Sequence, residues 1–156
     1  MKIHLCVVGR LRKGPEKELI DDYISRFEKI GRSHGLGPVS IIEVEDKKNG
    51  GMPNEALLLK RVIPKGALIA ILDERGQTLS SPDFAKKINS YVTSGISDMA
   101  FIIGGADGIA PTPQAISDLK ISFGKMVWPH ALVRVMIAEQ LYRAASILAG
   151  SPYHRN

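Results

Sequence analysis

The sequence has only one cysteine, Cys6, and one tryptophan among its 156 residues. A single cysteine cannot form an internal disulfide, which fits a reducing compartment. Cys6 lies within an apolar run, where we expect it to be a small buried side chain. No apolar run is long enough to span a membrane, and the N-terminus has no signal-peptide pattern. We therefore expect a cytoplasmic protein without a membrane segment.

Apolar segments that lack polar alternation are separated by segments of helical periodicity. Strands are predicted at residues 3–8, 39–44, 67–72, 99–103 and 119–123. Helices are predicted at residues 15–29, 54–62, 81–92, from 112 or 113 to 118, and at 130–149. Strands that are apolar on both faces, with helices between them, indicate a parallel sheet covered on both sides. Without repeats or a domain boundary, residues 1–156 are expected to form a single α/β domain.

Local signals predict where the elements begin and end. Asn54 is the expected cap of the second helix, and Ser81 with Pro82 is expected to start the third. The polar, glycine-rich residues 45–53 are predicted to form a mobile loop. Residues 73–76, which read Asp-Glu-Arg-Gly, are predicted to close the third strand. Asp73 could accept hydrogen bonds from a ribose there, or could simply form a turn.

Residues 123–134 place the only Trp, a Pro, a His and an Arg at one strand-to-helix junction. Ligands of parallel α/β folds bind at the carboxyl ends of strands, so this junction is a candidate site. The helix that follows is apolar on all sides, which favours burial of a second face by another subunit. Arg134 shares a helix face with His130 and has no acidic partner at helical spacing, so a ligand phosphate or carboxylate could pair with it. Glu139 and Arg143 can pair with each other.

A second candidate loop follows the strand at residues 99–103 and reads Gly104-Gly105-Ala106-Asp107-Gly108. Glycines at a strand end allow the backbone to approach a ligand closely, or form a tight turn. Their spacing matches neither the dinucleotide fingerprint nor the phosphate-binding P-loop. The four histidines lack metal-ligand spacing, and no nucleophile elbow is present. We therefore expect no metal and no acyl transfer.

Acidic residues are scarce near these candidate loops. The formal net charge is +5, and Glu139 is the only acidic residue after Lys120. A second basic cluster follows the first strand and consists of Arg10, Arg12, Lys13 and Lys17. Basic clusters are often only solvated surface, but two of them flanking a candidate site favour nucleic acid. The ending Tyr153-His154-Arg155 could stack on a base and bind phosphate, or could be an ordinary chain end.

Several motifs occur in order along the chain. They are Val8-Gly9-Arg10-Leu11, Ile103-Gly104-Gly105-x-x-Gly108, Ser122-x-x-Lys125-Met126-x-x-Pro129-His130-x-Leu132-x-Arg134-Val135, Glu139-Gln140-x-Tyr142-Arg143-Ala144 and Pro152-Tyr153-His154-Arg155. Together with the chain length, they resemble the SPOUT-type ribosomal RNA methyltransferase H family. The resemblance implies an α/β fold whose C-terminal part forms a deep trefoil knot. It also implies a homodimer that uses S-adenosylmethionine (SAM) as methyl donor, without a metal.

The reaction that the resemblance implies is methylation of N3 of a pseudouridine in large-subunit ribosomal RNA, on the assembled ribosome. The implied cofactor contacts are Leu72, Gly104, Gly105, Gly124, Lys125, Met126, Val127, Trp128 and Pro129. The candidate catalytic residues are Arg134, Tyr142, Tyr153, His154 and Arg155. Arg134 could stabilise charge on the carbonyl oxygens beside N3, and the others could hold the nucleotide or assist proton loss. The C-terminal tail could serve the partner subunit's cofactor.

Two other functions remain open at this point. A non-catalytic ribosome-binding or assembly factor could retain the same fold, and a SPOUT enzyme could modify another RNA. The glycine loop, the segment at 126–129 and the Tyr-His-Arg ending favour the pseudouridine methyltransferase.

Overall fold

The computed structural model describes residues 1–47, 50–105 and 108–154. A five-stranded sheet of order β2-β1-β4-β3-β5 forms its centre, and all neighbouring strands are parallel. The strands are β1 (Lys2–Val8), β2 (Val39–Val44), β3 (Leu68–Thr78), β4 (Asp98–Ile103) and β5 (Leu119–Ser122). The predicted single α/β unit with a parallel sheet is therefore confirmed in its fold class.

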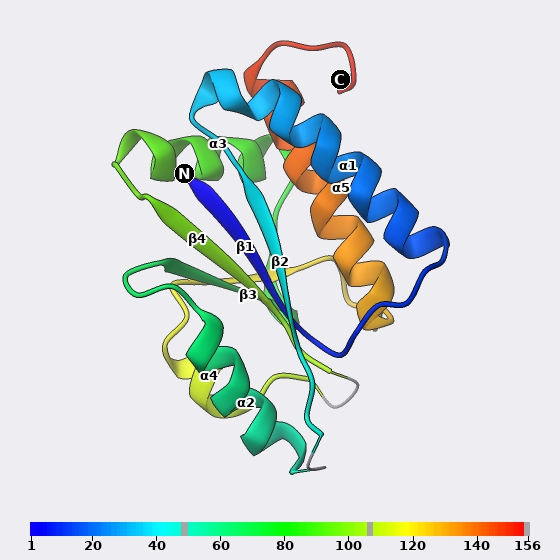
Figure 1. Ribbon diagram of the computed structural model, residues 1–156. Helices are drawn as coiled ribbons and strands as arrows, with labels where there is room; N and C mark the ends of the chain where they lie inside the picture. Colours follow the sequence, from blue (N-terminus) through cyan, green and yellow to red (C-terminus); the bar gives the residue numbers. More distant parts are fainter. Residues whose placement is uncertain (48–49, 106–107, 155–156) are drawn as a thin grey trace.

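Helices cover both faces of the sheet (Figure 1). One face packs against α1 (Pro15–Gly31), α3 (Ser81–Thr93) and α5 (His130–Leu148). The other face packs against α2 (Gly51–Val62), with α4 (Pro111–Ala115) on the same side. A short 3₁₀ helix, η1 (Arg32–His34), follows α1. None of the helices in the described part of the chain is long and apolar enough to cross a membrane.

Strand β1 is buried on both faces, which explains why its sequence lacks polar alternation. Leu5 and Val7 belong to the core on the side of α1 and α5, whereas Cys6 and Val8 belong to the core on the side of α2. Successive side chains of a strand point to opposite faces, so a strand covered on both sides needs apolar residues throughout. Cys6 is fully buried, and this burial raises the pKa of its thiol to about 11. The expected role of Cys6 as a small buried side chain is confirmed.

Strand β3 is longer than predicted, because residues 73–76 continue it instead of closing it. Ile121 of β5 pairs first with Leu72 and then, after a shift in register, with Gln77. The intervening residues bulge, and Gly76 passes over the β5 backbone so closely that a Cβ there would lie 2.6 Å from the carbonyl carbon of Ile121. The pairing with β5 is a long-range contact that the local turn signal could not reveal.

Two helices, α2 and α4, begin earlier than predicted, whereas α3 begins at Ser81 as predicted. Helix α2 begins at Gly51, because Asp46 accepts hydrogen bonds from the Gly51 amide and from the side chain of Asn54, so Asn54 is not the cap. The end of the predicted 45–53 loop is thus helical, and residues 48–49 within it lie outside the described residues. Ser80, rather than Ser81, caps α3 by accepting a hydrogen bond from the Asp83 amide. Helix α4 starts at Pro111 and ends at Ala115. The predicted trefoil knot, which depends on chain threading, stays a prediction.

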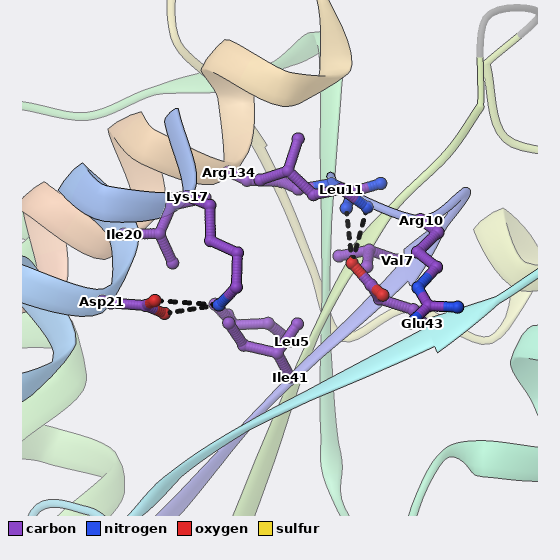
Figure 2. Close-up of a pocket in the computed structure, with 10 residues that line it drawn as sticks. All are labelled: Leu5, Val7, Arg10, Leu11, Lys17, Ile20, Asp21, Ile41, Glu43 and Arg134. Carbon is purple, nitrogen blue, oxygen red and sulfur yellow. Dashed lines mark hydrogen bonds and ion pairs between the residues drawn. The ribbon is translucent and has the colours of Figure 1, made fainter. Parts of the chain in front are cut away.

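Arg134 ties α5 to the carboxyl ends of β1 and β2. Its Nη2 donates to the carbonyl oxygens of Val8 and Gly9, at 2.6 and 2.9 Å, and its Nη1 donates to Glu43 at 3.3 Å. Arg134 is only 3% exposed, and this burial lowers its pKa while the charge of Glu43 opposes the shift. Glu43 also accepts the Leu11 amide, as Figure 2 shows. A strand, not the helix, supplies the acidic partner of Arg134.

The Glu43–Arg134 pair is predicted to contribute to the free energy of unfolding. Glu43→Ala leaves a buried guanidinium without its counter-charge, so we expect the free energy of unfolding to fall by about 2 kcal/mol. Urea denaturation at neutral pH measures the change. Asp22→Ala is the control, because it removes a pair with Arg26 in which both side chains are about half exposed. Such pairs contribute little, so the control should lose much less. Equal losses in the two variants would contradict the prediction.

Candidate functional site

A cavity of about 690 Å³ opens beside the bulged part of β3, where β4 and β5 end and α5 begins. The edge formed by the carboxyl ends of parallel strands is where α/β folds bind ligands. Its lining contains the predicted cofactor residues Leu72, Gly104, Gly105, Gly124, Met126, Val127, Trp128 and Pro129. Lys125 is exposed and is not part of this lining. The structure thus brings the two candidate loops together at one cavity.

The glycines after β4 form a turn that excludes side chains. A Cβ on Gly104 would overlap the backbone carbonyl group of Gly108. A Cβ on Gly105 would lie 3.2 Å from both a carboxylate oxygen of Glu55 and Cγ1 of Val8. The Gly108 amide donates to the Gly105 carbonyl at 3.1 Å, and Gly108 has φ +88°, a conformation that favours glycine. The turn therefore places bare backbone in the cavity wall.

The remaining walls are mostly apolar but include acidic side chains. Asp73 accepts hydrogen bonds from the backbone amide of Arg75, at 2.9 Å, and from its guanidinium, at 3.0 Å. The hydrogen bond from the Arg75 side chain lowers the pKa of Asp73, so Asp73 is a carboxylate at neutral pH. Glu74 lines the same cavity. Asp73 thus lies within β3 rather than in a closing turn, and its carboxylate pairs with Arg75, which lines the same cavity.

The outer wall is formed by the segment between β5 and α5. Ser122 fixes its start, because its hydroxyl bridges to the carbonyl groups of Glu74 and Gly124, at 3.0 and 2.7 Å. The Gly124 amide in turn donates to Ser122 Oγ. Beyond this point the segment is open: Met126 is 73% exposed and Val127 is 79% exposed. Large apolar side chains gathered at a cavity mouth are typical of surfaces that another molecule covers.

The first turns of α5 separate two cavities. His130 and Val133 line the 690 Å³ cavity, whereas Arg134 lines a second one of about 300 Å³ at the ends of β1 and β2 (Figure 2). The shared helix face predicted for His130 and Arg134 therefore does not place both at one site. His130 is the first residue of α5, and Pro129 occupies the cap position.

The other predicted catalytic residues lie near the far end of α5. Tyr142 lies roughly 18 Å along the helix axis from His130. The rings of Tyr142 and Tyr153 are 4.4 Å apart between centroids, and the guanidinium of Arg143 lies 4.8 Å from the Tyr153 ring. Neither tyrosine lines the 690 Å³ cavity.

Hydrogen bonds connect the C-terminal tail, which contains Tyr153 and His154, to α5, and burial together with these bonds keeps the Tyr153 phenol protonated. The Tyr153 hydroxyl donates to Glu139 at 3.0 Å, and Glu139 also accepts Arg143 Nε at 2.9 Å, which confirms the predicted Glu139–Arg143 pair. Burial, together with the bond to Glu139, raises the pKa of Tyr153, so the phenol stays protonated at neutral pH. Nδ1 of His154 is buried and has no hydrogen-bond partner among the described residues. Arg155 lies outside the described residues.

Comparisons with known proteins identify the family of this chain. A family model described as "Predicted SPOUT methyltransferase" matches residues 1–154. The ribosomal RNA large subunit methyltransferase H of Roseobacter denitrificans is 65% identical over 156 residues, which cover 100% of both chains. The protein of the same name from Ruegeria sp. (strain TM1040) is 63% identical over 99% of both chains.

A solved structure adds evidence for the fold. A probable methylase family protein from Haemophilus influenzae superposes with a TM-score of 0.56 over 99% of this chain and 70% of that chain, at 11% identity. At that identity the likeness concerns the fold alone. The family model and the full-length relatives carry the assignment of family. The chain belongs to the SPOUT methyltransferase family, among the ribosomal RNA large subunit methyltransferase H proteins.

Proposed function

We propose that this protein transfers the methyl group of SAM to N3 of a pseudouridine in large-subunit ribosomal RNA, on the assembled ribosome and in the cytoplasm. The observation that carries the proposal is the 690 Å³ cavity, where the glycine turn meets the segment at residues 124–129. The names of the full-length relatives support ribosomal RNA as the substrate. The choice of pseudouridine N3 follows from the motifs that resemble the family.

The residues of the cavity fit SAM as a ligand. Its volume lies within the range of about 300–1,000 Å³ that is typical of small-molecule sites. The turn at Gly104 and Gly105 leaves room for a ligand against the backbone, and Leu72 and Ile103 supply apolar wall. Asp73 is engaged by Arg75, and Glu74 is the other carboxylate of the lining that suits the positive charge SAM carries. We propose the lining residues Leu72, Gly104, Gly105, Gly124, Met126, Val127, Trp128 and Pro129 as its contacts, with Lys125 beside them on the surface.

The chemistry requires positioning more than activation. Bound SAM supplies a methyl group that is already activated by its sulfonium. The chain must therefore hold the nucleotide in line with that methyl and let the N3 proton leave. Tyr153 is no proton acceptor in the environment described, because its phenol is protonated and donates to Glu139. We propose that Tyr142, Tyr153, His154 and Arg155 hold the nucleotide, and that Arg134 acts through the backbone that it binds.

A homodimer would bring the tail to the cavity. Within one subunit, the tail and the 690 Å³ cavity lie toward opposite ends of α5, so we propose that the tail of each subunit completes the cavity of its partner. The surface for such a partner is apolar: Trp128 and Leu132 are 41% and 39% exposed, beside the open Met126 and Val127. Val135 and Met136, both half-buried, continue this surface along α5. We therefore propose that a partner subunit covers the expected second buried face of the helix.

Binding of SAM tests the cavity directly. Calorimetric titration should show binding by the natural chain, and Gly104→Ala should weaken it roughly ten-fold or more, because the turn must shift to admit a Cβ. Gly95→Ala is the control, since it strains a residue at φ +79° with open space around it and lies away from the cavity. Absence of binding by the natural chain would favour a non-catalytic ribosome-binding factor. Unchanged affinity in Gly104→Ala would place the ligand elsewhere.

Nucleoside analysis tests the substrate. Large-subunit RNA from a strain lacking this gene should contain pseudouridine in place of its N3-methylated form. The natural gene should restore the methyl group, whereas the gene encoding Gly104→Ala should restore much less. Loss of a different modified nucleoside would identify another RNA target and contradict the proposed position.

Sedimentation tests the dimer. Leu132→Glu places a charge on the proposed apolar interface and should raise the dimer dissociation constant roughly ten-fold or more. Leu57→Glu is the matched control, because Leu57 is 56% exposed and lies on α2, across the sheet from α5. A dimer that tolerates both changes equally would reject the α5 surface as the interface.

A further inference from the structure

The loop between β1 and α1 carries three exposed basic side chains, Arg10, Arg12 and Lys13. None of the three forms an ion pair with any residue that the structure describes. Lys17, the fourth member of the cluster, differs because it pairs with Asp21 at 2.8 Å. The loop therefore presents three uncompensated positive charges within four residues.

Nearby acidic side chains do not neutralise this charge. Glu16 and Glu18 lie in the first turn of α1, and neither forms an ion pair with the loop. Glu43, on β2, has its carboxylate engaged by the Leu11 amide and by Arg134. The acidic groups around the loop thus leave its three cations facing solvent.

The backbone of this loop is held in place at several points. The Gly9 amide donates to the Val44 carbonyl at 2.8 Å, and the Gly9 carbonyl accepts Arg134 at 2.9 Å. The Leu11 amide donates to Glu43 at 2.8 Å (Figure 2). A surface that is fixed before binding loses less conformational entropy when it binds. Arg10, Arg12 and Lys13 are therefore presented from an ordered backbone rather than from a free chain.

The loop also begins beside the cavity. Val8, the last residue of β1, lies close to the glycine turn. A Cβ built on Gly105 would be only 3.2 Å from Cγ1 of Val8. Residues 9–13 can extend at most about 17 Å from that point. A strand of RNA whose target base enters the cavity would thus have neighbouring phosphates within reach of the loop.

We propose that Arg10, Arg12 and Lys13 bind phosphates of the ribosomal RNA that flank the target nucleotide. The proposal rests on the proposed function, which it deepens by naming a surface that holds the substrate. Contacts of this kind position a nucleic acid without reading its sequence, and they release counterions on binding. Because the binding energy is electrostatic, its dependence on salt distinguishes it from packing.

The test replaces all three residues, as Arg10→Gln, Arg12→Gln and Lys13→Gln in one variant. The control removes the same charge elsewhere, as Lys60→Gln, Arg61→Gln and Lys65→Gln. These three residues are exposed at and after the end of α2, just before β3 begins, and therefore at the opposite edge of the parallel sheet. Both variants are compared with the natural chain for methyl transfer to large ribosomal subunits that lack the modification, and for equilibrium binding of those subunits at several salt concentrations.

The loop variant should raise KM for the subunits roughly ten-fold or more. Affinity falls as salt rises, and the steepness of log affinity against log salt should decrease by about 2, because three phosphate contacts of about 0.7 each are lost. Its affinity for SAM should match that of the natural chain. A loop variant that behaves like the control in both KM and salt slope would overturn the proposal. Weaker binding of subunits with unchanged binding of the naked RNA would also overturn it, since the partner would then be a ribosomal protein.

Failure of the proposed function gives a different result. If the natural chain transfers no methyl group, the enzymatic proposal fails, yet the binding measurement still reports whether the loop holds RNA. If transfer occurs and the salt slope is unaffected in the loop variant, only the assignment of the loop fails.

Discussion

Parallel pairing of the five strands is the constraint on which the rest of this structure depends. It places the carboxyl ends of β1, β3, β4 and β5 at one edge of the sheet. Three of these strands continue into a loop that carries part of the proposed chemistry: basic side chains after β1, the glycine turn after β4, and the open apolar segment after β5. Residues distant along the chain meet at this edge because hydrogen bonding aligns the strands in one direction.

A few polar side chains fix the positions of these loops relative to the strands and α5. Arg134 binds the end of β1 and pairs with Glu43 of β2, so the position of α5 is tied to the loop that carries Arg10, Arg12 and Lys13. Ser122 joins the bulged part of β3 to the start of the segment at 124–129. Arg134 and Ser122 are largely buried, so their hydrogen bonds are made in surroundings where an unmet partner is unfavourable. The loops can be open to solvent because the hydrogen bonds that hold them are shielded from solvent.

The proposed site is divided between two regions of one chain. The cavity lies at the start of α5, whereas Tyr153 and His154 are near the far end of that helix, where Tyr153 packs on Tyr142 and donates to Glu139. A helix is too rigid to bring its own ends together. Assembly of two subunits is the simplest arrangement that unites the regions, and it would also cover Trp128 and Leu132. The basic loop would add the substrate's backbone to this shared site.

The sequence by itself determined the elements and the class of fold, since apolar segments without alternation can be buried only in a sheet covered on both sides. The motifs that resemble the family pointed to part of the cavity lining, because glycines at strand ends leave a visible pattern. Tertiary structure alone decided the extension of β3 past Asp73, which depends on pairing with β5. It also decided the surroundings of Arg134. Its acidic partner, Glu43, is 91 residues away, and no local spacing encodes a contact made only when a strand and a helix pack together.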